Sequence, residues 1–150
     1  MTIPGKDNKT DRTQSLFPAI AARLPAPLIM ITLWVLSSQS TLPEMKGILG
    51  FDKFLHFTAF AALSVASGLW FSRGSWLGRP GRNFLICLAV VFVYGALDEF
   101  HQYFVPGRAS NIWDWVADIM GGAAGAAAAL LAVRFWDMRP KGLSKAGCIY

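Results

Sequence analysis

The amino-acid sequence predicts an all-α protein, a membrane bundle of four transmembrane helices. Hydrophobic residues make up 54% of the 150 residues and charged residues only 15%, whereas a soluble domain carries about a quarter charged residues. The apolar residues gather in long runs that are apolar on every side, so they lack the amphipathic stripe of a soluble helix. Lysine and arginine, which give a net charge of +5, fall mainly between these runs, as in membrane proteins.

The first predicted helix covers about residues 17–37. Its strongly apolar part is residues 27–36, and Pro25 and Pro27 indicate a kinked entry or a helix that begins near Pro25. Small residues at 38–40 resemble a signal-peptidase site, but the long polar leader and the prolines favour retention of the segment. We expect a flexible cytoplasmic tail over residues 1–15, a transmembrane domain over residues 16–136, and a second cytoplasmic tail over residues 137–150.

The other three predicted helices cover about residues 53–71, 83–104 and 112–135. Asp52 is the expected N-cap of the second helix, and a short turn over residues 72–82 separates it from the third. Pro106 and Gly107 end the third helix with a turn signal. The fourth helix contains Gly121-x-x-x-Gly125, a spacing that lets helix backbones approach closely in lipid.

The distribution of positive charge predicts the orientation. Only Lys46, Lys53 and Arg108 fall on one side of the predicted bundle, which leaves eleven of the fourteen lysine and arginine residues on the other. Positive residues mark the cytoplasmic side. We therefore expect a multi-pass protein of the cell membrane with both termini cytoplasmic and with the acid-rich turns facing outside.

Ionisable residues gather at three predicted helix ends on that outer side. They form pairs three or four residues apart, each on one helical face: Asp52 and His56, Glu99 and Gln102, Asp114 and Asp118. Asp118 is expected about 9 Å inside its helix. A carboxylate facing lipid there costs ~2 kcal/mol or more, so Asp118 should face the bundle interior.

These motifs resemble those of the VanZ-like family of small integral membrane proteins, over about residues 28–131. The matching residues are Asp52-Lys53-x-x-His56-Phe57, then Glu99-x-x-Gln102-x-x-x-Pro106-Gly107-Arg108, then Asp114. Where the family often has asparagine, this chain has Asp118, which adds a negative charge. The resemblance implies a cell-envelope setting and a link to glycopeptide antibiotic resistance, since the first member described is associated with reduced sensitivity to a glycopeptide. It implies no defined reaction.

Candidate catalytic residues are His56, Glu99 and Asp118, and candidate substrate-binding residues are Asp52, Lys53, Gln102, Arg108 and Asp114. A histidine oriented by a carboxylate can serve as a general base or nucleophile, and Arg108 suits an anion clamp. The same residue types also suit a structural network in which Arg108 pairs with Asp114. Asp98 and His101 are expected to lie at an interface between helices.

Three functions stay open at this point. The site acts on a membrane lipid or lipid-linked envelope substrate by group transfer or hydrolysis; or it binds or shields such a ligand without catalysis; or it is a structural network that supports a membrane partner or a homo-oligomer. Nucleic acid is not an expected partner. We assign no cofactor and no metal ligand, because neither H-x-x-x-H nor H-E-x-x-H occurs. A divalent cation held by the acids and histidines is the alternative.

Overall fold

All elements of the computed structural model are α-helices. The structure describes residues 20–40, 50–108 and 110–138, and these ranges contain no β-strand. The helices are α2 (Pro25–Ser37), α3 (Phe51–Gly68), α4 (Arg73–Gly78), α5 (Pro80–Tyr103) and α6 (Ile112–Met138). The predicted all-α class is confirmed for this part of the chain. The predicted tails lie outside the described residues, except that Asp137 and Met138 close α6.

Two of the four predicted spans have the length and composition of a membrane span. These are α5 and α6, with 24 and 27 residues. With 13 residues, α2 is about 20 Å long, which is less than the ~30 Å of a bilayer core. The 18 residues of α3 reach about 27 Å, and its first turn carries Asp52 and Lys53. Four membrane crossings are therefore not established by the helices themselves.

Three boundaries differ from the prediction. The predicted first helix is interrupted at residues 22–24, between the helical residues 20–21 and the start of α2 at Pro25, since proline lacks an N–H and fits the first turn of a helix. Its predicted start near residue 17 lies outside the described residues. The N-cap of α3 is Gly50, whose φ of 84° suits glycine, and Asp52 lies in the first turn. The predicted turn over residues 72–82 contains the short helix α4, where the Ser72 side chain accepts a hydrogen bond from the Ser75 N–H.

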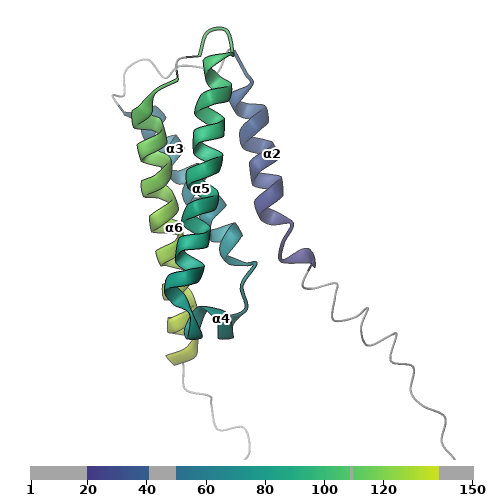
Figure 1. The fold of residues 1–150 in the computed structure, drawn as a ribbon, viewed down its shortest axis with the longest axis vertical. Coiled ribbons are helices and arrows are strands. Elements are labelled where there is room, and N and C mark those ends of the chain that lie inside the picture. The colour runs from purple at the N-terminus through teal and green to yellow at the C-terminus, as the bar shows by residue number, and fades with distance from the viewer. Residues whose placement is uncertain (1–19, 41–49, 109, 139–150) are drawn as a thin grey trace, which may run out of the picture.

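The helices form an up-and-down bundle in which neighbours along the chain run in opposite directions (Figure 1). Helices α2 and α5 run in parallel, as do α3 and α6. The end of α2 lies beside the end of α5, where Ser37 donates a hydrogen bond to Asp98. The start of α3 lies beside the start of α6, where Lys53 donates to Asp114. One end of the bundle therefore collects the acid-bearing ends of α3, α5 and α6, together with the end of α2.

The closest helix contact joins α3 and α6. A Cβ added at Gly121 would lie 2.1 Å from the carbonyl oxygen of Phe57, and one at Gly125 would lie 2.3 Å from that of Ala61. The Ser64 hydroxyl donates to the Gly122 carbonyl at 2.7 Å. The two glycines thus let α6 pack directly on the backbone of α3, as the Gly-x-x-x-Gly spacing predicts.

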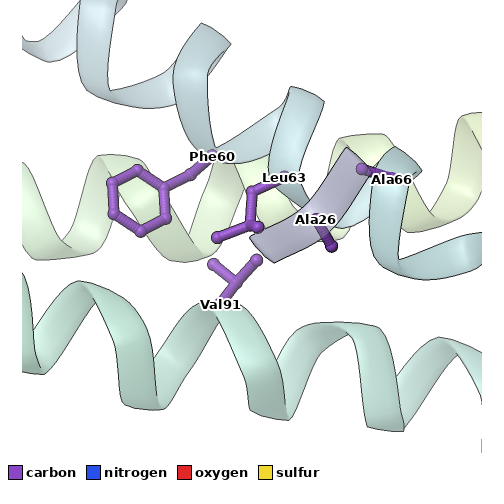
Figure 2. Packing of buried hydrophobic residues seen from close by; sticks show 5 residues of the cluster. All are labelled: Ala26, Phe60, Leu63, Ala66 and Val91. Carbon is purple, nitrogen blue, oxygen red and sulfur yellow. The ribbon is translucent and has the colours of Figure 1, made fainter. Parts of the chain in front are cut away.

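The bundle interior away from the acid-rich end is apolar. Phe60, Leu63 and Ala66 of α3 pack with Val91 of α5 and Ala26 of α2, and Figure 2 shows Leu63 directed toward Val91. Large apolar side chains also cover the outer surface; those more than 60% exposed include Ile31, Leu85, Phe100, Trp113, Leu131 and Trp136. An apolar exterior around an apolar core suits a lipid environment.

Replacing Gly121 by alanine should weaken the bundle. The added Cβ cannot coexist with the Phe57 carbonyl at 2.1 Å, so the helices must separate, at a cost of about 1–3 kcal/mol. The measurement is the free energy of unfolding in detergent micelles, followed by circular dichroism during titration with sodium dodecyl sulfate. Gly81→Ala is the matched control, since a Cβ there meets nothing within 4 Å. Equal stability of the two variants would contradict a close α3–α6 contact.

Candidate functional site

The candidate site lies where the starts of α3 and α6 meet the end of α5. The connection from α5 to α6 is short, and Gly107 turns it with a φ of 82°. Asn111 directly precedes α6 and caps its start, because its side-chain oxygen accepts a hydrogen bond from the Trp113 N–H at 3.0 Å. This connection places the first turns of α6 directly beside the last turns of α5 (Figure 1).

His56 and Asp118 form the innermost pair of the site. His56 Nδ1 lies 2.9 Å from Asp118 Oδ1, and the side chains are 15% and 0% exposed. Asp118 is therefore completely buried in the bundle, where the sequence analysis expected it. A carboxylate buried in an apolar bundle needs a polar partner, and His56 is that partner for Asp118. The same contact fixes the orientation of the imidazole ring.

Glu99 lies against the same pair and is held from the other side. Its Oε2 accepts hydrogen bonds from the Asn111 N–H at 2.8 Å and from the Ser110 hydroxyl at 3.1 Å. Ligand atoms of His56, Glu99 and Asp118 all lie within 4.8 Å of one another. The structure thus brings the three candidate catalytic residues together from three helices.

Two carboxylate oxygens in this cluster have no hydrogen-bond donor among the described residues. They are Glu99 Oε1 and Asp118 Oδ2. Buried polar atoms are satisfied in the great majority of cases, so two exceptions side by side are informative. Each carboxylate uses one oxygen for a protein contact and leaves the other available to a further group.

Lys53 covers the outer side of the cluster. Its ammonium group lies 2.8 Å from Asp52 and 3.0 Å from Asp114. Asp114 is buried, whereas the Asp52 side chain is 57% exposed. The partner of Asp114 is thus Lys53 rather than Arg108, which forms no ion pair within the described part of the chain. Arg108 is half-buried and follows Gly107 in the connection from α5 to α6. Lys53 and Arg108 together are called the rim.

Gln102 belongs to a second polar group, between α5 and α2. Its amide donates to Asp98 Oδ2 at 2.9 Å, and the Ser37 hydroxyl donates to Asp98 Oδ1 at 2.5 Å. His101 also contacts α2, since its Nε2 lies 2.9 Å from the Ser38 hydroxyl. Asp98 and His101 thus lie at a helix interface, as expected, and Gln102 joins them rather than the His56 cluster.

The sequence analysis missed the residues that orient Glu99. Ser110 and Asn111 hold it through a hydroxyl and a backbone N–H. A signal was present, because Ser-Asn directly before a long apolar run is a common helix start. What the pattern could not show is that the capped helix start would face a glutamate of the preceding helix.

The cluster has the composition of a proton-transfer or cation-binding site. An imidazole and two carboxylates offer nitrogen and oxygen ligands around one point, and His56 with Asp118 has the arrangement of a base and its orienting group. Arg108, which forms no ion pair within the described ranges, offers positive charge to an anionic ligand. Among the described residues, His56, Glu99 and Asp118 are the set that could hold a metal ion.

A comparison with protein-family models identifies one match, described as VanZ/LLP1, over residues 6–133. That range contains every residue of the cluster and of its rim. Comparisons with curated proteins and with solved structures return no match.

The interaction between His56 and Asp118 should be strongly coupled. In a double-mutant cycle of His56→Gln and Asp118→Asn, we expect an interaction energy of about 0.5–3 kcal/mol, because the pair is in direct contact and buried. The free energies of unfolding are measured in detergent micelles. The control cycle uses Arg73 and Asp137, an ion pair with 43% and 46% exposure, for which about 0–1 kcal/mol is expected. Additive effects at His56 and Asp118 would show that they do not interact.

Proposed function

The chain belongs to the VanZ/LLP1 family, and we propose that it is a multi-pass membrane protein whose polar site recognises and acts on a lipid-linked or other cell-envelope substrate with an anionic head group. Family membership and the two long apolar helices indicate a membrane protein. The reaction class we infer is group transfer or hydrolysis. A link to glycopeptide sensitivity, which the family resemblance implies, is part of the same proposal.

The observation that carries this proposal is the pair of unsatisfied carboxylate oxygens beside His56. A network with a purely structural role gains most when every polar atom is paired, because each unpaired one is costly in a low-dielectric interior. Glu99 Oε1 and Asp118 Oδ2 are buried without a donor among the described residues. This supports a site that binds a ligand, and it argues against a network whose role is only to hold the helices together.

Positive charge at the rim supports an anionic ligand. Asp52 and Asp114 both bind Lys53, so they offset its charge. Arg108 forms no ion pair within the described ranges and follows the turn at Gly107. Its guanidinium offers several donors in a plane, which suits a phosphate or carboxylate head group. We therefore assign the head group to the Arg108 side of the cluster.

We propose four membrane crossings, by α2, α3, α5 and α6, with the site at the outer surface. Arg73, Arg79 and Arg82 lie at the opposite end of the bundle, around α4, and positive residues favour the cytoplasmic side. In this arrangement both chain termini are cytoplasmic. The residues predicted as terminal tails then flank one transmembrane domain.

The orientation can be tested with single cysteines. In a chain that carries Cys87→Ser and Cys148→Ser, we introduce Ser40→Cys near the site end or Arg79→Cys at the other end; both positions are exposed. A membrane-impermeant maleimide should label Cys at position 40 in intact cells and Cys at position 79 only after permeabilisation. The reverse pattern would place the site on the cytoplasmic side.

The activity can be tested in liposomes that contain labelled polyisoprenyl phosphates and diphosphates. The wild-type protein should convert one of them, and His56→Ala and Glu99→Gln should lower the rate about 10²–10⁴-fold, the usual contribution of a general acid or base. Product formation is followed by chromatography. Asp137→Asn is the control, because this exposed residue lies at the far end of α6.

The same preparations separate catalysis from binding. Saturable lipid binding that depends on His56, with no product from any lipid, would overturn the enzyme and support a binding or shielding protein. Absence of both binding and turnover in the folded wild-type protein would overturn the proposed site.

A further inference from the structure

We propose that His56, Glu99 and Asp118 bind a divalent transition-metal ion such as Mn²⁺ or Zn²⁺. This inference deepens the proposed function and rests on the same site, but it needs no assumption about the lipid. It also departs from the sequence analysis, which assigned no metal ligand. The motif patterns that indicate metal sites require ligands close together in the sequence, whereas these three come from three helices.

The spacing of the three side chains suits one cation. Ligand atoms of all three lie within 4.8 Å of one another. With metal–ligand distances of about 2.0–2.4 Å, two ligands of one ion are about 3 Å apart when adjacent and at most about 4–5 Å apart. His56 Nδ1 and Asp118 Oδ1 are 2.9 Å apart, which is also the separation of two adjacent ligands, so an ion bound by both atoms would replace the hydrogen bond between them.

The carboxylates are oriented as metal ligands usually are. Glu99 is fixed by the Ser110 hydroxyl and the Asn111 N–H through Oε2, while Oε1 has no donor among the described residues. Outer hydrogen bonds of this kind orient a ligating group and leave its second atom for the metal. Both side chains are more than nine-tenths buried, Glu99 at 7% and Asp118 at 0% exposure.

Gly95 lets the second free oxygen, Asp118 Oδ2, approach the backbone of α5 closely. A Cβ at this position would lie 2.9 Å from Asp118 Oδ2, so any other residue would press against the carboxylate. Gly95 is one helical turn before Glu99 on α5. The absence of a side chain there leaves the face of α5 below Glu99 open to Asp118.

Charge balance also favours a cation. Two carboxylates are buried together, and burying charges without compensation is strongly unfavourable. The nearest lysine, Lys53, contacts Asp52 and Asp114 rather than Glu99 or Asp118. A divalent ion bound by the two carboxylates would supply two positive charges to balance them.

The ligand set indicates the class of ion. An imidazole nitrogen disfavours Mg²⁺ and Ca²⁺, which prefer oxygen ligands, while carboxylates suit Mn²⁺ and Zn²⁺. Three protein ligands leave coordination positions open, as in catalytic metal sites. Phosphate oxygens of an anionic head group can occupy those positions, which connects the ion with the substrate class proposed above.

Metal binding can be measured without any lipid. The purified full-length chain in detergent is treated with EDTA, dialysed, and titrated with Mn²⁺ by electron paramagnetic resonance and with Zn²⁺ by calorimetry. We expect about one ion per chain. His56→Gln, Glu99→Gln and Asp118→Asn should each weaken binding at least 10- to 100-fold, the loss seen even for outer-shell changes.

Asp98→Asn is the matched control. Asp98 is also buried at this end of α5, at 2% exposure, but both its oxygens accept hydrogen bonds, from Ser37 and Gln102. This variant should bind the ion as the wild type does. Circular dichroism of each variant shows whether it is folded, and the wild-type titration alone is decisive if a variant is not.

Folded wild-type protein with no saturable binding of either ion would overturn the inference, as would equal binding by the cluster variants and the wild type. The two proposals fail separately. Lipid turnover that depends on His56 but persists in EDTA would overturn the metal site and leave the proposed function standing. One bound ion per chain without any lipid binding would support the metal site and overturn the proposed lipid substrate.

Discussion

The contact between the backbones of α3 and α6 is the constraint on which the site depends. Gly121 and Gly125 lie directly on the carbonyl groups of Phe57 and Ala61, so the two helices have little freedom to slide or rotate past each other. Because α3 and α6 keep this alignment toward their first residues, His56 of α3 lies beside Asp118 of α6. Glycines within α6 thus fix the positions of ionisable groups near the starts of α3 and α6.

A parallel arrangement of these two helices has an electrostatic consequence. Both begin at the same end of the bundle, so the positive ends of two helix dipoles lie together there, which favours nearby carboxylates. Asp52 in the first turn of α3 and Asp114 in the first turn of α6 benefit from this arrangement, and α5, which runs the opposite way, contributes Glu99 from its last turns. Three chain segments distant in sequence can therefore share one acidic cluster with a single histidine.

The sequence predicted the presence of the helices better than their first and last residues. It also predicted which polar residues lie at the acid-rich end better than which of them contact each other. Apolar runs identify helices whatever they pack against. The Gly-x-x-x-Gly spacing identified a face of α6 for close packing, and the structure shows that α3 packs against it. Partners depend on rotation and register, which a run that is apolar on every side does not encode. This is why Arg108 was a plausible partner for Asp114 although Lys53 contacts it, and why Gln102 was grouped with Glu99 although it binds Asp98.

Asp98 and Glu99 differ in how completely their carboxylate oxygens are hydrogen-bonded. They are adjacent on α5, at the same end of the bundle, and both are buried. Asp98 faces α2, where both its oxygens accept hydrogen bonds. Glu99 faces α3 and α6, where one oxygen accepts two hydrogen bonds and the other none from the described residues. Because burial and position are matched, the difference lies in the surroundings, and it is the incompletely satisfied carboxylate that lies beside His56.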